Sequence, residues 1–477
     1  MPICAICTAP PAKRRPSMRL NPEFLRNLWI EMSLHRLIVM PIVLGGLFYL
    51  SWMTSSVNTL WNPRNFLILT YTVLVMMWGV PQAGDSVIQE ILHRTWDSQR
   101  MSILSPWSMT WGKLLGSTIF TWYGGIMVLG MLYAVMHLHY PYFPTTRLHQ
   151  LLLYSVGCGL LGQSLSLLLS LLSIHGGSLP RRRYISGPLA VGLVVSLLYL
   201  LGVIFFLVVP DAEKEMVFWH GWQTTLPTFT LYSLASFLLW SWLGLYRLMS
   251  QELQKPTGPL VWIAFLIFLC WYGAGFIQLS PSMEAGDQQM LQLWLAQAIM
   301  ALLTYFAAFF ESKNLLSYRK TLYYARRGAW RNLWHTIPLW WVGLCLLTAM
   351  LLNSLMSPFR LEFTQATLLF SGNAPIHLKW AMLAALLFMF RDLALMQLIY
   401  LNPNGQRARA TIILYLLVLY ILLPSVAATL GAAHITAPLF FPMAGYDPIL
   451  IVSPPMVEAL VVIGLAWSRW KSLMKSA

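Results

Sequence analysis

Charged side chains between residues 85 and 113 are the first candidates for chemistry in this sequence. The segment lies between two long apolar runs of a chain that is only 10% charged, and it holds three acids and three bases, Asp85, Glu90, Asp97, Arg94, Arg100 and Lys113. These residue types, a helical turn apart, favour charge pairing within a helix or with a second charged surface. The segment therefore predicts a polar surface rather than a centre of bond-making chemistry.

Apolar and polar residues in this segment alternate with the period of a helix. Ser86 and Gln89 have the spacing of a capping box, and an apolar stripe follows at Val87, Ile88, Ile91, Leu92 and Trp96. The opposite side carries Glu90, Arg94, Asp97 and Arg100, which can pair as Glu90 with Arg94 and Asp97 with Arg100. We predict one exposed helix over residues 85–101, ended by the "SP" at 105–106. A merely solvated helix face is the alternative.

The elements around this segment are membrane spans. Of the 477 residues, 58% are hydrophobic, which is too much apolar surface for one soluble core. Runs long enough for the hydrocarbon layer predict an all-α membrane protein of about twelve transmembrane helices. The runs are 36–53, 64–82, 114–137, 149–174, 186–209, 226–247, 259–279, 289–310, 338–356, 379–401, 410–432 and 449–468.

The basic residues indicate how these spans are oriented, because cytoplasmic loops are rich in Lys and Arg. With the N-terminus inside, five of the 31 basic residues fall on or at the edge of outer loops, Arg391 falls within a span, and the other 25 fall inside. Both termini are therefore predicted to be cytoplasmic. The net charge of +15 follows from this topology, and a nucleic-acid partner is excluded because the bases are scattered over short loops.

The chain before the first span has two parts. We expect residues 1–19 to form a disordered cytosolic tail, since they contain no periodic apolar pattern. Asn21 and Pro22 then predict the start of an amphipathic helix that is too short to span and lies in the inner headgroup layer. The domain organisation is this tail, a first six-span half at 20–250 that includes the helix at 85–101, and a second six-span half at 251–477.

The segment after the second span resembles the ABC-2 type permease family. The resemblance rests on Glu90, "RT" at 94–95, "LSP" at 104–106 and "GK" at 112–113, together with the preceding interfacial helix. It implies that the helix at 85–101 is a coupling helix, in which Glu90, Arg94, Asp97 and Arg100 meet a separate ATPase subunit. The chain itself has no G-x-x-x-x-G-K-[ST] phosphate loop, so ATP and Mg²⁺ would be bound by the partner, and this chain needs no cofactor or metal.

Two further places are candidates for function. The basic loop at 311–337 offers Arg326, Arg327 and Arg331 as a secondary cytosolic contact with lipid phosphate or an ATPase, with a plain topology anchor as the alternative. Glu458 is a candidate intramembrane acid. A break at "SPP" would instead place it in water at the outer mouth, and a span ending near Phe390 would place Arg391 and Asp392 at the inner surface.

The sequence therefore leaves two classes of function. The first is the permease subunit of an ATP-driven ABC exporter of a hydrophobic or amphipathic substrate, located in a bacterial inner membrane and bound to two ATPase subunits and to lipid. A homodimer or a further membrane subunit would complete it if one chain is not enough. The second is a stand-alone twelve-span secondary transporter or a membrane-embedded transferase. An ion-coupled carrier needs ionisable groups in mid-span, and here Glu458 and Asp392 are almost the only acids available.

Overall fold

A computed structural model describes most of the chain. The described residues are 21–54, 62–102, 104–175, 181–208, 215–277, 285–311, 315–356, 378–401, 408–441 and 447–475. The predicted tail at 1–19 lies outside them.

The protein is an all-α membrane protein with about twelve membrane-spanning helices. Among the described residues, eleven helices are long and apolar enough to cross a membrane, and α11 (Leu260–Ala274) is a shorter apolar helix at the position of the seventh predicted span. The other spanning elements are α2 (Leu34–Met53), α3, η1 and α4 (Pro63–Leu92 in all), α7 (Ile119–His139), α8 (Thr145–His175), α9 (Arg181–Val208), α10 (Leu226–Glu252), α12 (Ala285–Phe310), α15 (Leu339–Met356), α16 (Leu378–Tyr400), α17 to α18 (Ala408–Thr429) and α20 (Pro448–Lys475). The twelve-span prediction is confirmed at this level.

The chain folds as two compact units. Unit 1 comprises Met1–Leu171, Leu179–Pro210 and Thr230–Lys255, and unit 2 comprises Leu172–Ser178, Asp211–Phe229 and Pro256–Ala477. Each unit has its own buried apolar cluster.

Unit 1 is organised around its second span, which packs against α7 and α9. This span consists of α3 (Pro63–Tyr71), a π-helical stretch η1 (Thr72–Gly79) and α4 (Val80–Leu92). Tyr71 is fully buried, donates from its hydroxyl to the carbonyl of Ser155 on α8 at 3.0 Å and packs on Tyr199 of α9. In the hydrocarbon layer a helix must satisfy its backbone hydrogen bonds internally. What holds this span at the centre of the unit is therefore its side-chain packing.

Unit 2 is organised around α16, which packs along α20 and also touches α12, α15 and α17. A hairpin of β1 (Met216–Trp219) and β2 (Trp222–Thr225) caps one end of α11, where the Trp219 indole donates to the carbonyl of Tyr272 at 3.0 Å. Two short helices, α18 (Leu423–Thr429) and α19 (Ala433–Phe440), precede α20.

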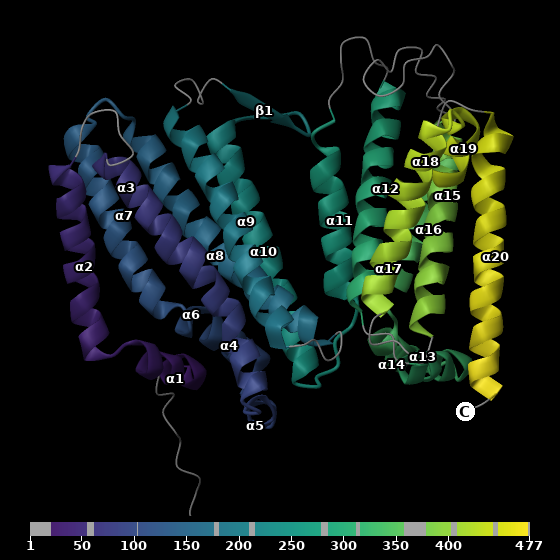
Figure 1. Cartoon of the computed structure of the whole chain (residues 1–477), viewed down its shortest axis with the longest axis horizontal. Coiled ribbons are helices and arrows are strands. Elements are labelled where there is room, and N and C mark those ends of the chain that lie inside the picture. The colour runs from purple at the N-terminus through teal and green to yellow at the C-terminus, as the bar shows by residue number, and fades with distance from the viewer. Residues whose placement is uncertain are drawn as a thin grey trace, which may run out of the picture. The chain divides into compact units, whose positions relative to one another are not determined.

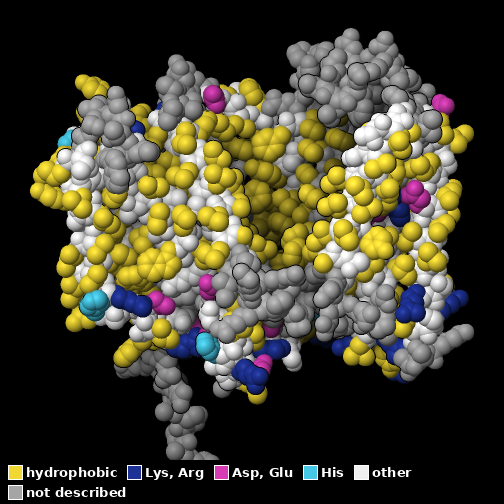
Figure 2. Space-filling view, in the orientation of Figure 1, with side chains coloured by type: hydrophobic (Ala, Val, Ile, Leu, Met, Phe, Trp, Pro, Cys, Tyr) yellow, Lys and Arg dark blue, Asp and Glu magenta, His cyan; other side chains and the backbone are white. Residues whose placement is uncertain are grey.

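Short helices lie outside the spans in both units. In unit 1 they are α1 (Pro22–Glu31), α5 (Trp96–Arg100) and α6 (Pro106–Gly116), and in unit 2 they are α13 (Leu315–Arg326) and α14 (Trp330–Thr336). The start of α1 is as predicted, because the Asn21 side chain accepts from the Glu23 amide and Pro22 takes the first helical position. Figure 2 shows most Lys and Arg side chains of this face gathered at the end of the helices where these short helices lie, below a surface covered by hydrophobic side chains.

The prediction of one helix over residues 85–101 is wrong. Residues 85–92 are the end of the second span, and the helix stops at Leu92. Arg94 then adopts a left-handed conformation, with φ of 58°, and α5 begins at Trp96. The predicted capping box is absent as well, because Ser86 lies within α4 and its hydroxyl donates to the carbonyl of Ala83 at 2.7 Å. The apolar residues between 87 and 96 keep a helical spacing across this turn, so the sequence pattern did not indicate it.

The predicted basic loop at 311–337 contains two short helices with a turn between them. α13 ends at Arg326, Gly328 has a φ of 65°, and α14 starts at Trp330. Gly tolerates this left-handed conformation without a steric penalty. Gly328 therefore allows the chain to turn between the two helices.

The orientation of the spans can be tested by cysteine labelling. In a chain whose own cysteines are replaced by serine, cysteines introduced at Ser98 of α5 and Ser317 of α13 are expected to be shielded from an impermeant maleimide in intact cells. A cysteine at Gln223 of the hairpin should react, because its loop is predicted to lie outside. All three side chains are at exposed positions, so differences in labelling report the side of the membrane. Labelling of Ser98→Cys but not of Gln223→Cys would overturn the orientation.

Candidate functional site

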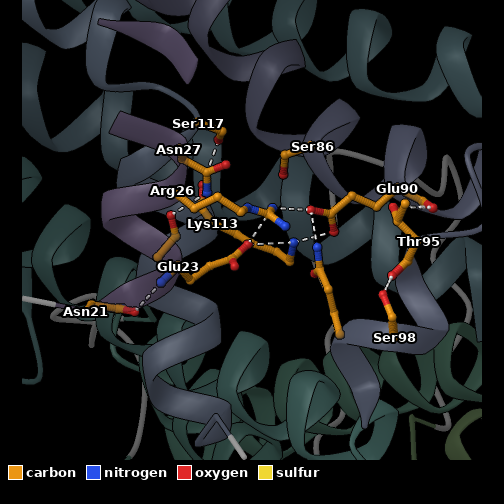
Figure 3. A network of polar contacts seen from close by, with 12 residues as sticks. Asn21, Glu23, Arg26, Asn27, Ser86, Glu90, Thr95, Ser98, Lys113 and Ser117 are labelled. Atoms are coloured by element: carbon orange, nitrogen blue, oxygen red, sulfur yellow. Dashed lines mark hydrogen bonds and ion pairs between the residues drawn. The ribbon is translucent and has the colours of Figure 1, made fainter. Parts of the chain in front are cut away.

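The end of unit 1 that carries α5 holds a network of charged side chains from three helices (Figure 3). Glu23 and Arg26 come from α1, Glu90 from the end of α4, and Lys113 from α6. The Lys113 ammonium donates to Glu23 Oε1 at 3.1 Å and also to Glu90 Oε2, and Arg26 donates to both acids. We call these four residues the charge network; its two acids and two bases balance.

The charge network is largely removed from solvent. The side chains of Lys113, Glu23 and Glu90 are 1%, 4% and 13% exposed. A buried charge must be paired, because its desolvation costs several kcal/mol. Lys113, Glu23 and Glu90 therefore compensate one another's charge, and Arg26, whose side chain is 41% exposed, closes the network on its solvent side.

Glycines let α1 approach α6 closely enough for these contacts. A Cβ added at Gly112 would lie 2.5 Å from Glu23 Cβ, and one at Gly116 would lie 2.8 Å from Asn27 Cβ. Asn27 donates to the carbonyl of Gly112 at 3.1 Å. The four-residue glycine spacing thus provides a flat face on α6, as in close helix pairs within membranes.

α1 turns its polar side toward the protein and its apolar side outward, whereas a surface helix of a soluble protein does the opposite. Its polar residues Glu23 and Asn27 face α6, whereas Trp29 and Ile30 are 84% and 64% exposed. Exposed apolar residues on a short helix beside the spans suit the interfacial layer of a membrane. The charge network therefore fixes an interfacial helix to the core of unit 1.

α5 extends the charge network to α10. The Gln99 side chain donates to Glu90 Oε1 at 2.7 Å, and the buried Trp96 ring lies 5.3 Å from the Lys113 ammonium. Glu252, near the end of α10, accepts from the Trp96 indole at 3.4 Å, and its carbonyl accepts from Arg100 Nε at 2.9 Å. A displacement of α5 would thus act on α1, α4, α6 and α10 together.

The four predicted coupling residues do not share one environment. Glu90 lies in the charge network, where its carboxylate accepts from Lys113 and Arg26 of the same chain. Arg94 and Asp97 are exposed on the turn and on α5. Arg100 pairs with Asp97 at 3.7 Å and also contacts Glu252. The predicted pair of Glu90 with Arg94 does not form among the described contacts.

Sequence reasoning missed Glu23, Arg26, Lys113 and Glu252 as site residues. Glu23 and Arg26 lie on the polar side of a predicted amphipathic helix, and Lys113 was counted among the charged side chains of its segment but assigned no partner. The signal in the sequence was the pair Gly112 and Gly116, whose four-residue spacing predicts a helix packed closely against α6. Which helix is that neighbour depends on the tertiary fold.

The predicted secondary contact is exposed. Arg326, Arg327 and Arg331 all lie at exposed positions around the turn between α13 and α14, and the Arg327 guanidinium stacks 4.6 Å from the centroid of the Tyr323 ring. Trp330 beside them is 74% exposed. Bases next to exposed aromatic residues suit the interface between headgroups and water.

Glu458 lies in a second cluster, at membrane depth in unit 2. Arg391 of α16 donates from Nη1 to Glu458 Oε2 at 2.5 Å, from Nε to Asp392 Oδ1 at 2.9 Å and from Nη2 to the Tyr420 hydroxyl at 2.9 Å. Asp392 also accepts from Tyr420 at 2.6 Å and from Tyr305 of α12 at 2.9 Å. We call these five residues the arginine cluster.

Both sequence alternatives for these charges are contradicted. α20 runs without a break from Pro448 through Pro454 and Pro455, so Glu458 is not at a broken outer mouth. α16 continues to Tyr400, which places Arg391 roughly 20 Å along the helix from its start and roughly 14 Å from its end. Arg391 and Asp392 are 3% and 1% exposed. Arg391 and Asp392 are buried in the middle of the spans because they pair with each other, and Arg391 also bonds across helices to Glu458.

Comparison of the chain with models of protein families, with curated proteins and with solved structures gave no significant match.

Proposed function

We propose that this protein is the membrane-spanning subunit of an ATP-driven ABC-type exporter, working with separate ATPase subunits in a bacterial inner membrane with both termini in the cytoplasm. The observation that carries the proposal is the convergence of three sequence features that are far apart in the chain. The interfacial helix α1, Glu90 and the Gly112–Lys113 pair are three of the features on which the resemblance to ABC-2 permeases rests, and they meet in one charge network.

This arrangement gives a motion at the cytosolic surface a route into the spans. The exposed side chains of the turn and of α5, including Arg94 and Asp97, would contact the ATPase. Closure of the ATPase pair around ATP and Mg²⁺ would move α5, and Gln99 and Trp96 would pass that movement to Glu90, Lys113 and Glu252. The spans α4, α7 and α10 would then shift together and change the opening of a substrate path. The chain supplies the moving parts, and the partner supplies the ATP chemistry.

The docking surface differs from the one that the sequence suggested. Glu90 holds the surface in place from within, whereas Arg94, Asp97 and the 81% exposed Met101 are free to touch a partner. This separation of roles allows folding and docking to be tested by different variants.

Reversing the exposed charges is expected to weaken ATPase binding without disturbing the fold. The chain is co-expressed with a candidate ABC-type ATPase from the same genome, and co-purification and ATP hydrolysis are measured. Arg94→Glu and Asp97→Lys should each reduce the retained ATPase about tenfold or more, because each sets like charges against each other in a contact. Both should elute as the parent does in gel filtration.

The matched control is Glu215→Lys, a reversal at an exposed acid next to the hairpin. It should retain the ATPase in full. Parental ATPase binding by both Arg94→Glu and Asp97→Lys would remove α5 as the docking surface, and failure of any ATPase to bind the parent would remove the exporter proposal.

A second candidate is a carrier that needs no ATPase. The observation that favours it is the arginine cluster, since ionisable groups at membrane depth are typical of ion-coupled transport. The same experiment separates the candidates, because a self-sufficient carrier would transport without the ATPase and would be indifferent to reversal of Arg94 and Asp97.

A further inference from the structure

The arginine cluster has more negative than positive groups. Among the described residues around it, Arg391 is the one base, and Asp392 and Glu458 are two acids, each bonded directly to the guanidinium. Tyr420 and Tyr305 complete the cluster with hydroxyl groups, which add no positive charge. With both carboxyl groups ionised, the cluster therefore carries one surplus negative charge.

A surplus charge at this depth is costly unless a positive partner compensates it. Asp392 is already well satisfied, because it accepts from Arg391, Tyr420 and Tyr305 and is only 1% exposed. Glu458 accepts a single bond, through Oε2, and among the described residues its Oε1 has no partner. The surplus therefore resides on Glu458.

Glu458 is also the member that a ligand can reach. Its side chain is 31% exposed, against 4% and 1% for those of Arg391 and Asp392. The residues around it on α20 present apolar side chains to the surroundings, with Val457, Leu460 and Val461 56%, 63% and 56% exposed. In Figure 2 an acidic and a basic side chain lie next to each other amid the hydrophobic surface over the helices of unit 2. The open side of Glu458 is thus bordered by surface suited to lipid.

We propose that Glu458 binds the positively charged group of an amphipathic cation that arrives laterally from the lipid, with the apolar part of that cation lying along α20. The Tyr420 ring already faces the Arg391 guanidinium, 5.4 Å from its centroid, whereas Phe441, 38% exposed and with its ring centroid 6.2 Å from that of Tyr420, offers a further aromatic ring. Aromatic faces attract cations of this kind. The inference names a substrate class for the proposed exporter and rests on that proposal for transport only, since binding needs no ATPase.

The test measures binding of tetraphenylphosphonium to the full chain in nanodiscs of neutral lipid, without ATP or ATPase. We expect saturable binding to the parent, about tenfold or more weaker binding to Glu458→Gln, which removes the charge at nearly constant shape, and unchanged binding to Glu215→Gln. Glu458→Asp should keep most of the affinity.

The results separate a ligand site from a purely structural ion pair. Parental affinity in Glu458→Gln, equal losses in Glu458→Gln and Glu215→Gln, or no saturable binding to the parent would each overturn the inference. If Glu458→Gln fails to fold, as judged by gel filtration, Glu458→Met takes its place. Weaker binding by Glu458→Met than by Glu458→Asp then supports the inference, and equal binding by the two variants overturns it. None of these results depends on whether an ATPase docks, so this inference and the proposed function can fail separately.

Discussion

Replacing Glu90 by lysine is expected to release α1 from unit 1 and to lower the free energy of unfolding by about 3–5 kcal/mol. The Glu90 carboxylate accepts from Lys113 and Arg26, and the Lys113 side chain is 1% exposed. The substitution removes an acid and adds a base, so the balanced network becomes a buried group of positive charges facing Glu23 alone. The measurements are denaturant unfolding of the purified protein and the rate of tryptic cleavage after Arg26, which should rise as α1 detaches.

Two variants serve as controls for Glu90→Lys. Glu90→Gln keeps hydrogen-bonding atoms near Lys113 and Arg26 and should cost less than the reversal. Arg94→Glu, four residues along the chain and exposed, should change the free energy of unfolding by only about 0.5 kcal/mol, as surface substitutions do. If Glu90→Lys unfolds at the same denaturant concentration as the parent and α1 stays resistant to trypsin, the charge network does not hold the helix.

Replacing Arg391 by methionine is the second change with a large expected effect. It would leave Asp392 and Glu458 without a base in the middle of unit 2, where Arg391 now bonds to both acids and to Tyr420. Removing one partner of a buried ion pair costs about 3–5 kcal/mol, because the remaining charge stays desolvated. We expect the purified variant to unfold at a clearly lower denaturant concentration and temperature than the parent.

The charge interpretation of this loss can be checked within the same cluster. Arg391→Lys keeps the charge but not the planar fork that reaches three partners, so it should recover only part of the stability. Adding Asp392→Asn to Arg391→Met removes one of the orphaned charges and should restore stability relative to Arg391→Met alone. An additive loss in the double variant would mean that packing, rather than charge, accounts for the effect.

Local signals explain why much of the fold could be predicted. The spans follow from runs of apolar residues long enough for the hydrocarbon layer, and the seventh was found although α11 is only 15 residues long. The start of α1 follows from Asn21 and Pro22, which act on the backbone beside them. The break at Arg94 was missed because the apolar period on both sides of it is continuous and a single residue in a left-handed conformation leaves no trace in that period.

The candidate sites depend on partners that the sequence does not rank. Glu90 has Arg94 at the helical spacing of a salt bridge, yet it pairs with Lys113 and with Arg26, which lies 64 residues away. In the same way, Arg391 bonds across 67 residues to Glu458. Local spacing predicted the wrong partner for Glu90 because the helix ends before the left-handed Arg94, and α1 and α6 each supply a base that bonds to Glu90.

The sequence by itself determined that this is a membrane protein of about twelve helices, where its charges stand along the chain and where α1 begins. These are properties of single segments, since hydrophobic length and helix capping require no distant neighbour. Only the tertiary structure decided that Glu90 faces inward while Arg94 and Asp97 face outward, and that Arg391, Asp392 and Glu458 meet within the spans. The reason is physical: a charge in an apolar surrounding is stable only beside its counter-charge, and which one lies within reach is set by how helices such as α1 and α6, or α16 and α20, pack.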